Sequence, residues 1–256
     1  MRELGLICTD FDGTLLGPAV RVEELTMLRD LLRECRQRWR CRWVIATARP
    51  MSTLRPALFD FLMHGLAPAF VVTEDALLYR RGARGRYVPF WWWNFNILRR
   101  RFHAGRRSLK EIAQLRETIH SQFPDVNDLS NTQVNLWLRF SDDDRALRAE
   151  IVLRDCLDDG DHFALFRWGR EIFLAPASGT KGEALQKLTR KFGVPRGKTL
   201  AIGDGPNDVS MLDGSAAGLP ACVANAVPHV RDVVRKAGGY VCAEENMGGV
   251  IEALQI

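Results

Sequence analysis

Residues 8–15, with the sequence CTDFDGTL, decide the fold of this chain. The apolar run at residues 4–8 predicts a short buried strand. Asp10 and Asp12 follow where that strand should end, and side chains two residues apart on extended backbone point the same way. Two converging carboxylates repel each other, and a divalent cation would relieve that repulsion. The stretch therefore predicts a strand whose carboxyl end carries an acidic site.

Further strands and helices alternate through residues 1–81. Leucines at helical spacing predict an amphipathic helix over residues 22–39, and short apolar runs predict strands at 42–47 and 69–73. Pro50 is suited to the first position of a helix, which predicts a helix from there to about residue 63. This alternation predicts an α/β fold with a Rossmann-like, doubly wound parallel sheet.

The pattern changes at about residue 82, where arginine and tryptophan become frequent. The residues that follow predict two helices, a strand and a hairpin, without a buried parallel run. We expect an α+β unit at 82–175, inserted into a catalytic core made of residues 1–81 and 176–256. The predicted elements of this unit are helices at 108–122 and 142–157, a strand at 133–140 and a hairpin at 162–175.

A second acidic motif, GDGPND at residues 203–208, follows a predicted strand at 199–203. Pro206 suits the first helical position, which places Asp204 just before a helix and Asp208 about one turn into it. In open α/β sheets, ligands gather at the carboxyl ends of the strands. Together with Asp10, these carboxylates suit Mg²⁺, a hard cation that is often shared with a phosphate.

Two further residues suit a phosphate group. Thr47 ends a predicted strand and offers a hydroxyl beside a helix N-terminus. Lys181 lies in the first turn of a helix predicted to begin after Thr180, where the helix dipole disfavours a cation unless an anion is near. Taken singly, the two residues would be a helix-capping threonine and a surface lysine.

Composition narrows the class of protein. The chain has 256 residues, a net charge of +5 and 46% hydrophobic residues, which predicts a globular protein with anionic partners. Six cysteines without a paired spacing indicate reduced thiols and a cytoplasmic protein. No apolar run approaches the roughly 18 residues that span a bilayer, so no membrane partner is expected.

The run of arginine and tryptophan at residues 80–107 has three interpretations. Tryptophans 91–93 could pack inside the inserted unit with the arginines solvated. The run could instead line a surface that attracts an anionic substrate, or bind nucleic acid by stacking and phosphate contacts. We favour them in that order.

The four motifs together resemble motifs I to IV of the haloacid dehalogenase superfamily. They are residues 10–14 (DFDGT), Thr47, Lys181 and residues 203–208, in the order and spacing of that superfamily. The insertion looks like the C2 (type IIB) cap of the Cof-like phosphatases, which include sugar-phosphate phosphatases. EIFLAPASGTKGEALQKL at residues 171–188 and CVANA at residues 222–226 also resemble segments of that group. The resemblance implies a phosphoric monoester hydrolase.

Two segments depart from the family pattern. Residues 47–49 are TAR, with alanine where these relatives usually carry glycine. Residues 73–76 are TEDA where many Cof-like members have Asn-Gly-Ala. The second loop borders the active site in the family, so its added acidity bears on the choice of substrate.

The resemblance assigns a role to each motif. Asp10 would attack phosphorus and form an aspartyl phosphate, while Asp12 would act as general acid and then general base. Asp10, the main-chain carbonyl of Asp12 and Asp204 would hold Mg²⁺. Phosphoryl oxygens would be bound by Thr47, Lys181 and Asn207, with Asp208, Arg49 and Gly13 in supporting positions.

The leading hypothesis is thus a Mg²⁺-dependent phosphatase of a small phosphorylated metabolite, such as a sugar phosphate. A phosphomutase or phosphotransferase would use the same pair of aspartates and differ only in the acceptor. A non-catalytic protein that binds nucleic acid is the third possibility. The presence of Asp10, Asp12, Lys181 and Asp204 argues against it, and the sequence leaves the oligomeric state open.

Overall fold

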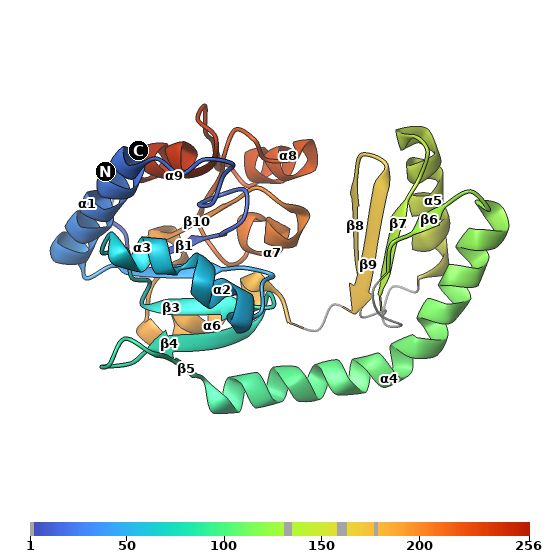
Figure 1. Cartoon of the computed structure of the whole chain (residues 1–256), viewed down its shortest axis with the longest axis horizontal. Helices are drawn as coiled ribbons and strands as arrows, with labels where there is room; N and C mark the ends of the chain where they lie inside the picture. Colours follow the sequence, from blue (N-terminus) through green and yellow to red (C-terminus); the bar gives the residue numbers. More distant parts are fainter. Residues whose placement is uncertain (1–2, 131–134, 158–162, 177–178) are drawn as a thin grey trace. The chain divides into compact units, whose positions relative to one another are not determined.

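The computed structural model describes residues 3–130, 135–157, 163–176 and 179–256 (Figure 1). The chain forms two compact units, one of Met1–Asn94 with Gly179–Ile256 and one of Phe95–Ser178. The second unit is therefore an insertion between the two segments of the first.

An eight-stranded sheet forms the centre of the larger unit, in the order β12-β11-β10-β1-β2-β3-β4-β5. The strands from β12 to β3 run parallel to their neighbours, whereas β4 and β5 are antiparallel. Their bounds are β1 Leu6–Thr9, β2 Arg42–Ala46, β3 Phe70–Thr73, β4 Leu77–Arg81, β5 Tyr87–Pro89, β10 Thr199–Gly203, β11 Leu219–Cys222 and β12 Tyr240–Val241.

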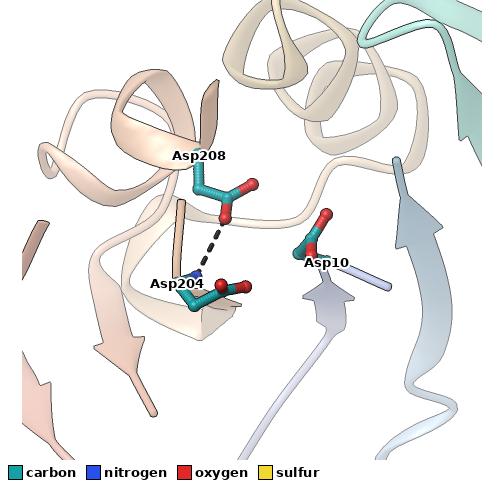
Figure 2. Close-up of side chains that lie close together, drawn as sticks. All are labelled: Asp10, Asp204 and Asp208. Carbon is teal, nitrogen blue, oxygen red and sulfur yellow. Dashed lines mark hydrogen bonds between the residues drawn. The ribbon is translucent and has the colours of Figure 1, made fainter. Parts of the chain in front are cut away.

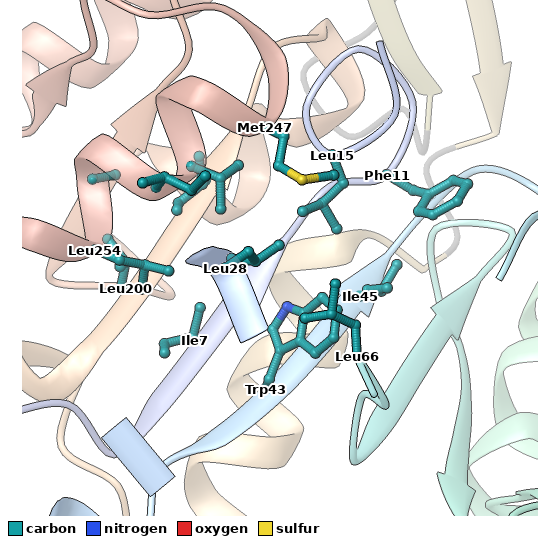
Figure 3. Close-up of a cluster of buried hydrophobic side chains, with 14 of the residues drawn as sticks. Ile7, Phe11, Leu15, Leu28, Trp43, Ile45, Leu66, Leu200, Met247 and Leu254 are labelled. Carbon is teal, nitrogen blue, oxygen red and sulfur yellow. The ribbon is translucent and has the colours of Figure 1, made fainter. Parts of the chain in front are cut away.

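Helices cover both faces of this sheet because its buried strands are apolar on both faces. Ile7 packs into one core, whereas its neighbours Leu6 and Cys8 pack into the other, as the alternation of a strand requires. Figure 3 shows the first core, where Ile7 and Leu28 lie among its labelled side chains. The first core includes residues of α1 (Val22–Trp39), α2 (Met51–Ala57), α3 (Phe59–Met63) and α9 (Asn246–Gln255); the second includes residues of α6 (Lys181–Phe192), α7 (Val209–Leu212) and α8 (Pro228–Lys236). This arrangement confirms the predicted doubly wound α/β fold.

The predicted helix from Pro50 to residue 63 is divided in the structure. Pro50 is the residue before α2 rather than its first residue, and α2 ends at Ala57. Pro56 lies inside α2 and has no N–H to donate within the helix, which is consistent with the early end. The chain continues as the separate short helix α3.

The smaller unit contains a four-stranded antiparallel sheet in the order β6-β7-β9-β8. Ile119 from α4, Leu153 from α5 and Leu138 from β7 are buried in its core. The bounds are α4 Trp91–Gln122, β6 Asn127–Asp128, β7 Leu136–Arg139, α5 Asp143–Cys156, β8 Phe163–Trp168 and β9 Glu171–Pro176. The inserted unit is thus α+β, as predicted. Residues 133, 134 and 162, included in its predicted strand and hairpin, lie outside the described residues.

The start of the insertion differs from the predicted residue 82. β5 pairs with β4, so residues 87–89 belong to the sheet of the larger unit. The compact smaller unit begins at Phe95, within α4. The sequence did not indicate β5 because the strand is three residues long and only partly buried.

α4 is much longer than the predicted helix at 108–122, and it carries the whole run from Trp91 onward. The side chains of Trp91 and Trp92 are 76% and 78% exposed, so the preferred interpretation, packing inside the inserted unit, is wrong for both. Trp93 instead packs against the second core of the larger unit, and its Nε1 donates to the carbonyl of Ala76 at 2.8 Å.

Candidate active site

Three parallel strands bring the predicted site residues together. Thr9 of β1 lies in register with Ile45 of β2 and Ile202 of β10. Asp10, Thr47 and Asp204 each follow one of these strands, so they share the carboxyl edge of the sheet. Figure 2 shows Asp10 and Asp204 at this edge, with Asp208 beside them.

Lys181 stands at the centre of this acidic group. Its side chain is 0% exposed, which rules out a surface lysine. Its Nζ donates to Oδ1 of Asp10 and to Oδ1 of Asp208, both at 2.5 Å. A buried ammonium group is tolerated only when it is paired in this way. Helix α6 packs closely against Ser210 and so places Lys181 among these carboxylates. This close packing requires glycine at residue 182, because a Cβ there would lie 2.0 Å from the carbonyl oxygen of Ser210.

Asp208 holds the loop that carries Asp204. Its Oδ2 accepts hydrogen bonds from the backbone N–H groups of Asp204 and Gly205, both at 2.9 Å. Its Oδ1 accepts from Lys181, so both oxygens are engaged by the protein. A Cβ on Gly203 would lie 2.5 Å from Oδ2 of Asp208, and glycine is therefore needed there. Asp208 fixes the geometry of the loop.

Burial and charge make the remaining carboxylates suited to a cation. Burial, and then the charge of Asp208, raise the pKa of Asp10 well above its usual value. Burial raises the pKa of Asp204 to about 6, against the hydrogen bond that Thr14 Oγ1 donates to Asp204 Oδ1 at 2.6 Å. Burial therefore disfavours the ionised form of both carboxyl groups. A bound cation would stabilise that form.

The donor set fits Mg²⁺. One oxygen from each of Asp10, Asp204 and Asp208 lies within 4.8 Å of the others, and carboxylate oxygens are the ligands of a hard cation. Since Asp208 is committed to Lys181 and the backbone, Asp10 and Asp204 are the two carboxylates that could hold the ion.

Gly13 shapes the turn beside Asp204. Its φ is +79°, a conformation that other residues adopt with strain, and a Cβ there would lie 2.4 Å from Oδ2 of Asp204. Asn225 Nδ2 donates to the Gly13 carbonyl at 2.7 Å, and Asn225 Oδ1 accepts from the N–H of Asn246 at 2.9 Å. The sequence did not single out Thr14 or Asn225 as site residues, although both lie inside quoted motifs.

Asp12 pairs with Arg49 rather than joining the buried carboxylates. Arg49 donates from Nε to Oδ2 of Asp12 at 2.7 Å and from Nη2 to Oδ1 at 2.5 Å. The hydroxyl of Thr47 accepts from the backbone N–H of Arg49 at 3.0 Å, which fixes the start of this loop. Thr47 therefore does not cap α2, whose N-cap is Pro50; its hydroxyl holds the turn before that helix, at the edge where Asp10 lies.

The loop that departs from the family pattern brings a further carboxylate to the site. Asp75 Oδ1 accepts from Asn207 Nδ2 at 3.0 Å and lies 3.9 Å from Nζ of Lys181. Glu74 and Asp75 have φ angles of 49° and 61°, in the left-handed region that costs energy for residues other than glycine. Asn207, predicted to bind phosphate, thus contacts Asp75, a residue that sequence reasoning placed near the site without a role.

A family model described as haloacid dehalogenase-like hydrolase matches residues 99–254, well over half of the chain. This chain belongs to that family. Within the described residues, no helix is long and apolar enough to cross a membrane.

The most similar curated proteins include phosphatases. A phosphoglycolate phosphatase of Methanothermobacter thermautotrophicus is 33% identical over 104 residues, which cover 41% of this chain and 44% of that protein. A phosphoglycolate phosphatase of Methanothrix thermoacetophila is 41% identical over 22% of this chain and 24% of its own length. The matches thus span less than half of these two relatives. A 5-amino-6-(5-phospho-D-ribitylamino)uracil phosphatase of Bacillus subtilis is 24% identical over 99% of this chain and 95% of its own.

Solved structures share the fold. The sucrose-phosphatase of Synechocystis, solved with sucrose and phosphate, has a TM-score of 0.69 at 21% identity, covering 100% of this chain and 98% of its own. A haloacid dehalogenase-like hydrolase of Bacillus subtilis has a TM-score of 0.59 at 15% identity, covering 100% and 93%. Both likenesses support the two-unit architecture.

Proposed function

We propose that this protein is a Mg²⁺-dependent phosphatase that hydrolyses a small phosphorylated metabolite, a sugar phosphate, through an aspartyl phosphate on Asp10. The observation that carries this proposal is the buried group in which Lys181 bonds Asp10 while Asp204 lies beside it. A nucleophile, a cation for the phosphoryl oxygens and a metal site then meet at one edge of the sheet.

Asp10 is the proposed nucleophile. A carboxylate oxygen of Asp10 forms a bond to phosphorus as the bond from phosphorus to the leaving oxygen breaks, which divides one difficult displacement into two. The contact from Lys181 orients the carboxylate, and its charge offsets the charge of the transferring group. Thr47 and Asn207 are proposed to bind the remaining phosphoryl oxygens.

Asp12 is the proposed proton carrier. It gives a proton to the leaving oxygen and then takes one from the water that attacks phosphorus, while the bond from phosphorus to Asp10 breaks and inorganic phosphate is released. Both of its oxygens are engaged by Arg49, so Arg49 must release one of them before a proton can move. Arg49 is therefore proposed to position Asp12 until substrate enters.

Asp10, Asp204 and the main-chain carbonyl of Asp12 are the proposed Mg²⁺ ligands. When bound, the ion supplies positive charge against the phosphoryl oxygens. Asp208 and Gly13 support these ligands through the contacts that hold Asp204 in place.

The division of labour between the units is also a proposal. The larger unit, residues 1–94 and 179–256, is the proposed catalytic core, and the smaller unit, residues 95–178, is the proposed cap that selects the leaving group. On the sheet of the smaller unit, Trp137 and Phe166 both lie in register with Phe173, and all three are partly exposed. Such aromatic side chains suit a ring of the substrate, and relatives named for sucrose phosphate hydrolysis and for a phosphoribityl compound support a sugar phosphate.

The proposal is tested by release of inorganic phosphate from a panel of sugar phosphates, nucleotides and phosphoglycolate, with Mg²⁺ or with EDTA. We expect the protein to hydrolyse sugar phosphates when Mg²⁺ is present and not in EDTA. We expect no hydrolysis by Asp10→Asn. Asp60→Asn is the matched control, because Asp60 is an exposed aspartate of α3. Activity that survives in EDTA or in Asp10→Asn would contradict the proposal. Transfer of the phosphoryl group to an added sugar, in place of water, would identify a phosphotransferase.

A further inference from the structure

A hollow of about 850 Å³ lies in the larger unit at the opposite edge of the sheet from Asp10. It is lined where β2 and β3 begin and where the antiparallel β4 ends. Seven arginines line it, and the described lining residues include no aspartate or glutamate. The arginines are Arg29, Arg33, Arg36, Arg40, Arg42, Arg80 and Arg81.

Four of these arginines form a single stripe on α1. Positions 29, 33, 36 and 40 are spaced by four, three and four residues, which places them on one face of the helix and its C-terminal cap. Like charges at this spacing repel and destabilise a helix. Asp30, which contacts Arg29 and Arg33, offsets only part of that repulsion.

The backbone of Arg40 gives a second, independent indication that the hollow is a functional site. Its φ is 54°, a left-handed conformation that favours glycine or asparagine at the end of a helix. The chain nevertheless carries an arginine there, at the rim of the hollow. Strained positions occupied by an unsuitable residue are a known mark of functional sites.

The hollow has an apolar floor beneath the arginines. Cys41, Trp43 and Leu66 line it and are buried in the first core. Figure 3 shows Trp43 beside Leu66 in the first core. Arg42 is held against the ring of Phe192, with its guanidinium carbon 4.1 Å from the ring centre. The hollow thus has arginine side chains around it and a small apolar floor.

We propose that this arginine hollow binds a nucleoside polyphosphate, with the phosphates among the arginines and the base toward the apolar floor. Arginine pairs with phosphate oxygens through two parallel hydrogen bonds, and seven arginines suit several phosphates at once. The volume falls in the range of pockets for small ligands, which favours a nucleotide over a nucleic-acid strand lying along an open surface. Nothing in this inference depends on the proposed phosphatase activity.

Binding is measured by calorimetry on the full chain in EDTA, with a non-hydrolysable ATP analogue, inorganic triphosphate, adenosine, a single-stranded RNA oligomer and anionic vesicles as probes. Arg36→Gln/Arg40→Gln removes two charges from the hollow. Arg38→Gln/Arg190→Gln is the matched control, since it removes two exposed arginines that do not line it. Arg38 lies on the same helix, between the two mutated positions.

We expect the ATP analogue to bind, and to bind about tenfold or more weakly in the hollow variant, with less than about a twofold change in the control. Phosphate-ester hydrolysis should be unchanged in both variants. Equal affinity in the wild type and the hollow variant, or equal weakening in the control, would overturn the proposal. Tighter binding of RNA or vesicles than of the ATP analogue would also overturn it, as would triphosphate binding as tightly as the analogue.

Discussion

The charged side chains at the two edges of the larger sheet differ in how far they are paired within the protein. At the carboxyl edge, Lys181 is fully buried between Asp10 and Asp208, so charges meet their counterparts within the protein. At the amino edge, seven arginines line a hollow; among the described residues, Asp30 pairs with Arg29 and Arg33, and no lining residue is acidic. The five residues of β2 separate these edges by roughly 16 Å.

The two edges therefore differ in what a ligand would have to supply. The carboxyl edge is preorganised, because its charges are fixed by burial and short contacts before any substrate arrives. The amino edge carries arginines whose mutual repulsion a bound anion would lower further. We propose chemistry at the first edge and recognition of an anion at the second.

Lys181→Met should give the largest effect. It leaves Asp10 and Asp208 buried without their shared cation, and removing one partner of a buried ion pair costs about 3–5 kcal/mol. We expect the free energy of unfolding in urea at pH 7.5 to fall by that amount, and by less at pH 5, because burial raises the pKa of Asp10 and lets that carboxyl take up a proton. Lys187→Met, on the exposed side of α6, should change it by less than about 0.5 kcal/mol. A similar loss in both variants would contradict the preorganised edge.

Gly13→Ala should cost about 1–2 kcal/mol through its left-handed backbone. It should also raise the Mg²⁺ concentration for half-maximal activity, because the added Cβ would lie 2.4 Å from Oδ2 of Asp204. Gly193→Ala is the control: Gly193 has a φ of 62° and nothing within 4 Å of the added Cβ. It should lose similar stability and keep its Mg²⁺ requirement. An unchanged requirement in Gly13→Ala would separate Gly13 from the metal site.

The effect of Mg²⁺ on stability should depend on pH. The pKa of Asp204 is about 6 in the folded protein against 3.8 as its ordinary value. The folded state therefore binds more protons between these values, and the contribution of Asp204 to stability falls as pH rises through that window. Mg²⁺ should offset this loss, so its increase in Tm should be larger at pH 7.5 than at pH 5. Equal shifts at both pH values would contradict the assignment of Asp204.

Arg40→Gly should show the smallest effect and the opposite sign. Glycine adopts the left-handed conformation of residue 40 without strain, so the free energy of unfolding should rise by about 0.5–1 kcal/mol. Binding of the ATP analogue should weaken. Arg40→Gln should weaken binding without the gain in stability. If Arg40→Gly binds the analogue as tightly as the wild type, Arg40 has no part in the arginine hollow.

The carboxyl edge could largely be predicted from the sequence. Asp10, Thr47 and Asp204 each end a short apolar run, and parallel strands bring such ends together whatever the details of packing. The position of Lys181 in the first turn of a helix could also be predicted, because the sequence indicates a helix that begins after Thr180.

Other features depend on contacts that no local pattern records. Asp75 approaches Asn207 across 132 positions of the chain, through two residues in left-handed conformations that their types do not favour. The arginine hollow joins α1, β2 and β4, and the sequence predicted these elements without indicating that their arginines meet. α4 exceeded its predicted length because apolar side chains of its early turns, among them Trp91, Trp92 and Phe95, are exposed, so the apolar residues there do not follow the buried stripe that contains Ile97.

The most direct test of the central claim is detection of a phosphorylated Asp10. Asp12→Asn, mixed with p-nitrophenyl phosphate and Mg²⁺ and quenched in acid, should accumulate the intermediate, because this leaving group needs little protonation while the second step lacks its base. Mass spectrometry of the peptides should then find one phosphoryl group on Asp10, lost on treatment with hydroxylamine. Release of p-nitrophenol in a burst with no phosphoryl group on Asp10, or with one on another residue, would contradict the account.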